Sequence, residues 1–296
     1  MKITILGANS YIARNMIYLL KEKDDIELSL YDYQEAHLDG EASYQALNIL
    51  DKNAVASVDL KCDIIYMFIG KTGTLQGFDD FETYININEK ALLNVLSAYR
   101  EQKSDAKLVF PSTRLVYKGS DVPKTEDAEK EFKTLYAINK YACEQYLEMY
   151  HRMFDVKYLI LRICVPYGTM IPNASSYGTA EFMLGKAMKK ENISLYGDGQ
   201  VRRTLVHMED LCNVLYEAAI HAECVNDVFN IGGEDYSLKE MANLIATQYG
   251  VGVDYVDWPE AALKIESGST VFDAGKLQSI LHYEFRNSFE GWIVKQ

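Results

Sequence analysis

Two side chains that can exchange protons stand four residues apart in the stretch YAINK, where they are Tyr136 and Lys140. Because one helical turn separates them, a helix would place the phenol and the ammonium on the same face. Just upstream, the stretch VFPSTRLVY places Ser112 and Thr113 at the carboxyl end of a predicted strand. Ligands of open α/β sheets bind at that edge. Thr113, Tyr136 and Lys140 are therefore the candidate catalytic residues.

The same spacing occurs a second time, in Tyr99 and Lys103, so the pattern by itself has little weight. This second pair lies at the end of a predicted helix that looks exposed, just before a strand. The position of Tyr136 near a sheet edge favours it over Tyr99 as the reactive tyrosine.

A strand-turn-helix stretch at residues 5–16, ILGANSYIARNM, is similar to a dinucleotide-binding turn with two glycines replaced. Gly7 supplies the tight turn, Ser10 stands where a pyrophosphate would approach the backbone, and Ala13 where helix and strand pack. The helix N-terminus still offers free N–H groups to an anion. Asp32 ends the second predicted strand, where a carboxylate accepts hydrogen bonds from the adenosine ribose. No arginine stands near Asp32, which favours NAD over NADP.

The candidate cofactor contacts come from this turn, from the ends of the following strands and from the helix of the YAINK stretch. They are Gly7, Asn9, Ser10, Tyr11, Ile12, Asp32, Asn48, Ile49, Phe68, Ile69, Gly70, Asn88, Tyr136 and Lys140.

Strands alternate with helices through the first half of the chain, which predicts βαβ crossovers and a Rossmann-type, doubly wound parallel sheet. CDIIYMFIG and VKYLILRI are near-continuous apolar runs, as in strands buried on both faces. After VPYG the alternation changes, and SLKEMANLIATQYG has Ser237 and Glu240 at the spacing of a capping box. We expect an NAD-binding domain at 1–166, to which 205–235 returns, and a smaller α/β substrate lobe at 167–296.

The composition limits the class of partner. The formal net charge of −13 argues against a nucleic-acid binder, and no apolar run approaches the ~18 residues that a membrane span needs. The histidines and cysteines show no metal-ligand spacing. The cysteines are odd in number, lie among apolar neighbours and indicate free thiols in a reducing cytoplasm: Cys62, Cys143, Cys164, Cys212 and Cys224.

These motifs, in this order, resemble the extended short-chain dehydrogenases/reductases, in the group of NAD-dependent nucleotide-sugar epimerases and dehydratases. The glycine turn, STRLVYKG, YAINK, LRICVPYG, YGDGQVRRTLVHMEDL and VFNIGG match segments of that family almost from end to end. The resemblance implies that Tyr136 moves the proton of a sugar hydroxyl while hydride passes to or from NAD. It also implies that Lys140 holds the nicotinamide ribose, that Thr113 orients the hydroxyl, and that Arg203 grips a diphosphate oxygen.

Physical estimates apply to these implied roles. A phenol with a pKa of ~10 must lose several pKa units to act near neutrality. An ammonium ~5 Å away supplies ~3 kcal/mol, or about two units, at an effective dielectric of ~20. Lys140 is therefore not quite sufficient, and the positive nicotinamide must supply the rest. The resemblance also implies a homodimer, in which helices near 84–100 and 136–153 pair with those of a second copy.

Some residues depart from the family pattern. Arg114 and Leu115 follow the threonine, where 4,6-dehydratases carry an Asp-Glu pair, so that reaction is disfavoured. Val165 replaces a common asparagine, and no arginine occurs between Arg203 and Arg286. The first hypothesis is an epimerase similar to UDP-glucose 4-epimerase. The alternatives are a ketosugar reductase or dehydrogenase and a cofactor-sensing protein without catalysis.

Overall fold

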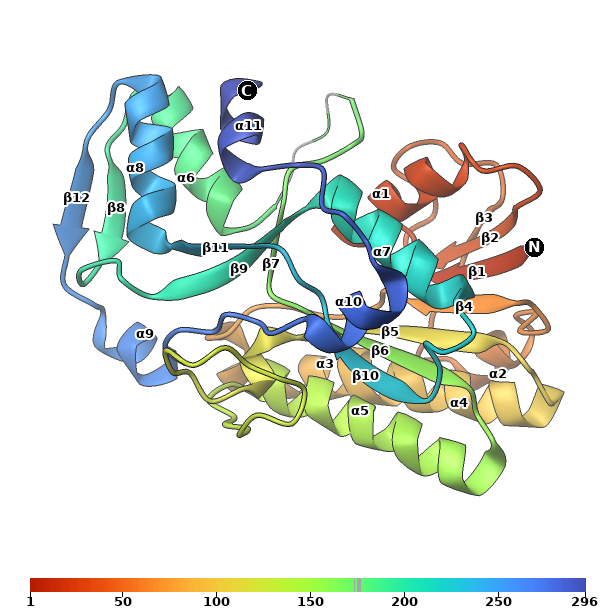
Figure 1. The fold of residues 1–296 in the computed structure, drawn as a ribbon. Coiled ribbons are helices and arrows are strands. Elements are labelled where there is room, and N and C mark those ends of the chain that lie inside the picture. The colour runs from red at the N-terminus through yellow and green to blue at the C-terminus, as the bar shows by residue number, and fades with distance from the viewer. Residues whose placement is uncertain (173, 175–176) are drawn as a thin grey trace.

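A seven-stranded parallel sheet forms the centre of the molecule (Figure 1). The computed structural model describes all residues except 173, 175 and 176. The strand order β10-β6-β5-β4-β1-β2-β3 places β1 between the two halves of the sheet, as in a doubly wound fold. The strands are β1 (Lys2–Leu6), β2 (Glu27–Asp32), β3 (Tyr44–Ala46), β4 (Ile64–Met67), β5 (Lys107–Thr113), β6 (Tyr158–Ile163) and β10 (Asp227–Asn230).

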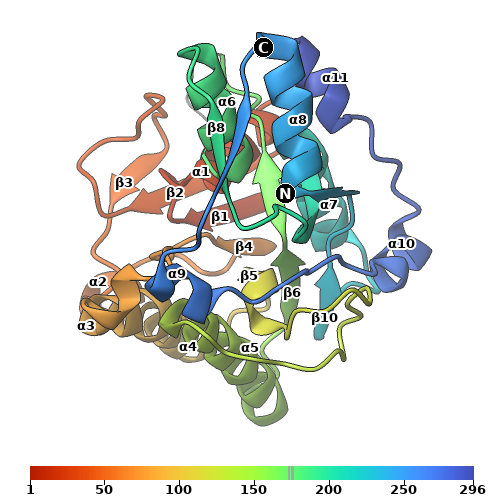
Figure 2. The ribbon, with the colours of Figure 1, turned by 90° about the vertical axis from the view of Figure 1, so that its left-hand side faces the viewer.

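Helices cover both faces of this sheet, each over its own hydrophobic core (Figure 2). One face carries α1 (Tyr11–Leu20) and α7 (Met208–Ile220), which pack together, with α10 (Gly275–Leu281) beside β10. The other face carries α2 (Lys52–Ala56), α3 (Phe81–Ile85), α4 (Ala91–Gln102) and α5 (Leu135–Phe154). A π-helical turn, Asn86–Lys90, joins α3 to α4, and short 3-10 turns lie at Gln76–Phe78 and Arg114–Val116.

The C-terminal part adds two small sheets and a third hydrophobic core. The three-stranded sheet has the order β11-β9-β7, and the two-stranded sheet pairs β12 with β8 in parallel. Its strands are β7 (Val165–Tyr167), β8 (Ile193–Tyr196), β9 (Arg202–His207), β11 (Glu234–Ser237) and β12 (Val253–Val256). Its helices are α6 (Thr179–Met188), α8 (Leu238–Tyr249), α9 (Glu260–Ile265) and α11 (Phe289–Val294).

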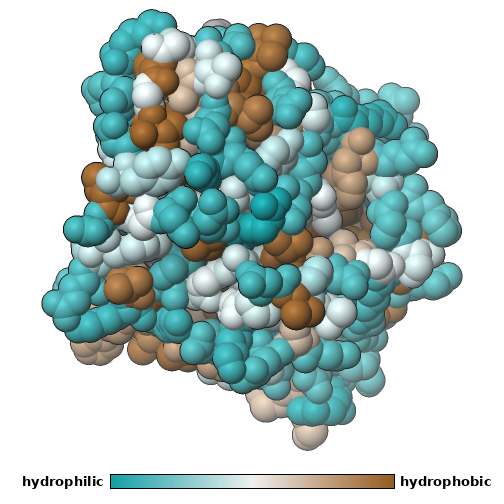
Figure 3. Space-filling view, turned by 60° about the vertical axis from the view of Figure 1, so that its left-hand side comes forward, coloured by the Kyte–Doolittle hydropathy of each residue, from teal (hydrophilic) through white to brown (hydrophobic). Residues whose placement is uncertain are grey.

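The predicted α/β class and parallel sheet are confirmed, and the capping box of Ser237 and Glu240 is present at the start of α8. β10 belongs to the central sheet, where it pairs with β6. The division into lobes at residue 167 stays a prediction. None of the described helices combines the length and hydrophobicity that a membrane crossing requires. The face drawn in Figure 3 is largely hydrophilic, with hydrophobic side chains in small separate groups.

Candidate active site

Two adjoining cavities open along the carboxyl ends of the central strands. The larger, about 510 Å³, extends from the turn after β1 to the residues that follow β2 and β4. The smaller, about 410 Å³, continues to the ends of β5 and β6 and to α5. Ser10, Phe68 and Gly70 line both cavities, so the two form one continuous site. An elongated two-part ligand fits this shape.

The turn after β1 comes close to the backbone that follows β4. Gly7 has a φ of +88°, and a Cβ built on it would lie 2.6 Å from the backbone nitrogen of Ile69, so only glycine fits here. Ser10 is the N-cap of α1, where its hydroxyl accepts a hydrogen bond from the backbone N–H of Ala13. The serine that replaces a family glycine thus stabilises the helix end that an anion would approach.

Asp32 faces the larger cavity at the end of β2. Its carboxylate accepts hydrogen bonds from the backbone N–H of Asn9 at 2.9 Å and of Tyr33 at 2.7 Å, which hold it in place. Arg14, on α1, is bound by Asp39, whose pKa it lowers through the hydrogen bond between them. The charge of Arg14 is therefore already neutralised by Asp39. In the described part of the chain, no arginine lines the larger cavity.

Most of the cofactor contacts predicted from the sequence line the two cavities. Those in the larger cavity are Gly7, Asn9, Ser10, Asp32, Asn48, Ile49, Phe68, Ile69 and Gly70. Those in the smaller are Ser10, Tyr11, Ile12, Phe68, Gly70, Tyr136 and Lys140. Asn88 does not line either cavity. Its side-chain amide accepts from the backbone N–H of Lys71 and donates to the backbone C=O of the same residue. Its contact with a cofactor stays a prediction.

Thr113, Tyr136 and Lys140 meet at the smaller cavity. Thr113 ends β5. α5 begins after Thr134, which caps the helix by accepting from the backbone N–H of Ala137. Lys140 donates a hydrogen bond from Nζ to the carbonyl of Pro111 at 2.8 Å. The structure therefore brings the three predicted catalytic residues together, with the lysine anchored to the strand that carries the threonine.

Burial sets the protonation of this group. It raises the pKa of the Tyr136 phenol above its usual value, and the side chain of Thr113 partly offsets that rise. Burial also lowers the pKa of the Lys140 ammonium to about 8. At neutral pH the phenol is therefore neutral and the lysine is charged. A positive charge added at this site would favour the phenolate, since an opposite charge stabilises an ionised group.

Arg203, the predicted diphosphate ligand, is buried on β9 and already has an anionic partner. Its guanidinium donates to the carboxylate of Glu266 at 2.8 Å and to the carbonyl oxygens of Arg202 and Gly268. The role of Arg203 in binding a diphosphate stays a prediction. Its neighbour Arg202 lies nearer the surface, where it pairs with Asp235 and Glu240.

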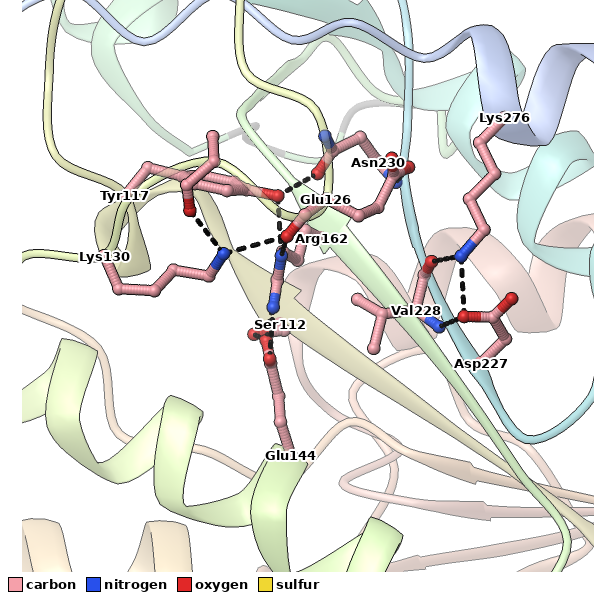
Figure 4. Close-up of polar contacts among 11 residues, drawn as sticks. Ser112, Tyr117, Glu126, Lys130, Glu144, Arg162, Asp227, Val228, Asn230 and Lys276 are labelled. Carbon is pink, nitrogen blue, oxygen red and sulfur yellow. Dashed lines mark hydrogen bonds and ion pairs between the residues drawn. The ribbon is translucent and has the colours of Figure 1, made fainter.

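A buried polar network that the sequence analysis missed joins α5 to the neighbouring strands β5 and β6 (Figure 4). Glu144, one turn after Lys140 on α5, forms an ion pair of 2.6 Å with Arg162 on β6, and both side chains are at most 4% exposed. Glu144 also accepts a hydrogen bond from Ser112, next to Thr113. Arg162 donates on its other side to the hydroxyl of Tyr117. The network therefore fixes β5, β6 and α5 relative to one another at the site.

Glu144→Gln is expected to lower the free energy of unfolding by about 3–5 kcal/mol, because it leaves the buried charge of Arg162 without a partner. Urea unfolding measures this loss. Glu148→Gln is the matched control, one turn further along α5, where Glu148 pairs with Arg152 in an exposed ion pair. That change should cost less than about 1 kcal/mol. Equal losses in the two variants would show that the buried pair has no special weight.

Tyr99, the tyrosine of the competing match, is not at an exposed helix end. It is buried on α4, and its hydroxyl donates to the carbonyl of Ala106 at 2.9 Å. The expected exposure was wrong because Tyr99 packs into the hydrophobic core between α4 and the central sheet. Tyr99 does not line either cavity.

Comparison with known proteins identifies the family of this chain. The model of the NAD dependent epimerase/dehydratase family matches residues 3–232. A putative UDP-glucose 4-epimerase of Methanocaldococcus jannaschii is 27% identical over 56% of this chain and 54% of its own length. A UDP-glucose 4-epimerase of Mycoplasma pneumoniae is 26% identical over 96% and 91%. A UDP-glucose 4-epimerase structure from Thermotoga maritima has a TM-score of 0.84 at 20% identity, covering 99% of this chain and 96% of that one. The chain belongs to the NAD-dependent epimerase/dehydratase family, whose cofactor is NAD.

Proposed function

We propose that this protein is an NAD-dependent epimerase of a nucleotide sugar, which acts by transient oxidation at a sugar hydroxyl. The observation that carries the proposal is the continuity of the two cavities. Asp32 lies in the larger one, and Thr113, Tyr136 and Lys140 lie in the smaller. The first suits the adenosine half of a dinucleotide, and the second suits a nicotinamide next to a sugar.

The residues present fit NAD. The backbone after Gly7 and the capped N-terminus of α1 suit a pyrophosphate, and Asp32 suits the adenosine ribose. Lys140 would hold the nicotinamide ribose. When bound, NAD supplies the acceptor and donor of hydride.

The side chains of Thr113, Tyr136 and Lys140 carry out the transfer of the proton of the sugar hydroxyl. Thr113 orients the sugar hydroxyl, and the phenolate oxygen of Tyr136 takes its proton as the carbinol C–H bond breaks and the carbonyl forms. The keto sugar then rotates in the site and presents the opposite face of its carbonyl group. The phenol returns the proton to the carbonyl oxygen as hydride is added to that face. The sugar is thus oxidised and then reduced with no net change in electrons. Lys140 keeps a positive charge near the phenolate throughout.

The test combines cofactor analysis with turnover. Purified protein is denatured and the released NAD and nucleotide sugars are measured, and the folded protein is incubated with UDP-glucose, UDP-galactose and their dTDP counterparts. An epimerase retains NAD and interconverts C4 epimers without added cofactor. A reductase would instead require added NADH and consume it, and a cofactor sensor would bind NAD without converting any sugar.

We further propose the homodimer expected from the helices near 84–100 and 136–153, with its contact at the N-terminal ends of these helices, at α3 and α5. Exposed apolar side chains border a groove of about 250 Å³ there: Phe78, Phe81, Phe132 and Ile138. Contact with a second copy would remove them from water.

The described cysteines form no disulfides, which supports a cytoplasmic location.

Ile138→Asp is expected to shift the protein toward monomer in sedimentation velocity, because it places a charge in the apolar face of α5. The control is Phe182→Asp on α6, where another exposed apolar side chain lies outside this groove. A wild-type protein that sediments as a monomer at every concentration would contradict the proposed dimer.

A further inference from the structure

A second arginine lies near Arg203 where the substrate cavity meets the C-terminal part. Arg114 directly follows Thr113, and its Nη1 donates to the hydroxyls of Ser267 at 3.2 Å and Thr270 at 3.3 Å. Among the described residues, no carboxylate forms an ion pair with Arg114, and its other two guanidinium nitrogens have no hydrogen-bond acceptor. Hydroxyl dipoles do not neutralise a guanidinium, so Arg114 has no ion-pair partner of its own among the described residues, and the nearby Glu266 carboxylate only partly favours its charge.

The charges in this cluster do not balance. Arg114 and Arg203 bring two positive charges, whereas Glu266 brings one negative charge and is bound to Arg203. Burial, followed by the like charge of Arg203, lowers the pKa of the Arg114 guanidinium to about 10. Arg114 is still protonated at neutral pH. The cluster therefore has an excess positive charge inside an acidic protein.

Arg114 does not itself line the smaller cavity, but it adjoins residues that do. Thr270, which accepts from Arg114, also accepts at its carbonyl from the thiol of Cys164, and both Cys164 and Thr113 line the smaller cavity. The segment at 266–273 is held against the residues after β5. The backbone N–H of Ser120 donates to Ser269, and that of Lys124 donates to Val271. The hydroxyls that position Arg114 are therefore part of a fixed wall.

We propose that Arg114 binds an oxyanion of the substrate, either a phosphate of the nucleotide or a carboxylate on the sugar. Both groups accept two parallel hydrogen bonds from a guanidinium, and Arg114 has two nitrogens available for them. Arg203, held by Glu266, then braces the C-terminal segment. The inference rests on the proposed function, because it takes the ligand of the smaller cavity to be a nucleotide sugar.

Calorimetric titration of the NAD-bound enzyme tests the proposal, with UDP, UDP-glucose and UDP-glucuronate, or the dTDP compounds, as probes. Arg114→Gln should weaken binding of the oxyanion-bearing probe by about 10–100-fold and make it less dependent on salt. NAD affinity should not change. A loss for all three probes assigns the oxyanion to the diphosphate, and a loss confined to UDP-glucuronate assigns it to the sugar carboxylate.

Arg202→Gln is the matched control, since it removes the same charge from a neighbouring exposed side chain and should leave all three affinities unchanged. Arg114→Lys keeps the charge but loses the two-pronged geometry, so it should show a smaller loss and the wild-type salt dependence. It also serves if the glutamine variant does not fold.

Wild-type affinities in the Arg114 variants would overturn the inference, as would an equal loss in Arg202→Gln. If the enzyme interconverts sugars while Arg114→Gln binds like the wild type, only this inference fails. If the wild-type protein neither converts nor binds any of the compounds, the proposed function fails with it.

Discussion

Tyr136→Phe is expected to lower turnover by about 10²–10⁴-fold, which is the contribution of a positioned acid or base. The phenyl ring of phenylalanine keeps the shape of the buried side chain. The variant lacks the phenolic oxygen, which is the atom of Tyr136 that would carry the substrate proton. NAD affinity should stay close to that of the wild type, because the hydroxyl acts in proton transfer more than in binding. Steady-state kinetics and cofactor titration measure the two effects separately.

Tyr99→Phe is the control for this variant. It removes the same atom from a buried tyrosine on α4 that does not line the cavities. Loss of its hydrogen bond to Ala106 should cost about 1 kcal/mol of stability without changing the rate. If Tyr99→Phe were as inactive as Tyr136→Phe, the choice between the two matches would be unsupported. Full activity in Tyr136→Phe would rule out the proposed mechanism.

Lys140→Met should have opposite effects on activity and stability. Turnover and NAD affinity should both fall, because the variant lacks the charge that favours the phenolate and holds the ribose. The folded protein should nevertheless become more stable near neutral pH. Burial lowers the pKa of the lysine from 10.5 to about 8, so folding disfavours its charged form by roughly 3 kcal/mol. The variant also loses the hydrogen bond to the carbonyl of Pro111, which reduces this stabilisation by about 1 kcal/mol.

The sign of this effect follows from proton binding. Between pH 8 and 10.5 the unfolded chain holds the lysine proton more tightly than the folded protein does. The wild type should therefore gain stability from this group as pH rises through that range. The difference in melting temperature between the variant and the wild type should be largest near pH 7 and shrink toward pH 10. A variant less stable than the wild type at pH 7 would contradict the expectation.

The sequence predicts those parts of the site that depend on local patterns. Gly7 and Asp32 mark the ends of strands, and the spacing of Tyr136 and Lys140 fixes their shared helix face. Parallel topology then brings strand ends to one edge, so the cavity could be expected before the structure was known.

The parts that were missed depend on pairs distant in the chain. Glu144 meets Arg162 only because α5 packs over β5 and β6, and the partner of Arg203 lies on a late segment with no pattern of its own. The strands β3, β8, β9, β11 and β12 were also missed. Apart from β9, each is a run of three or four residues, which has too few positions to show alternation.

The position of β10 has a consequence for synthesis. β6 is flanked by β5 and by β10, yet β10 is made more than sixty residues later. While the chain emerges from the ribosome, β6 (YLILRI) can already pair with β5, but its other edge stays open until residues 227–230 arrive. An open apolar edge invites pairing with another chain. Arg162 is the only charged residue of this strand, and a charge at an open edge disfavours pairing with another chain until β10 closes the sheet.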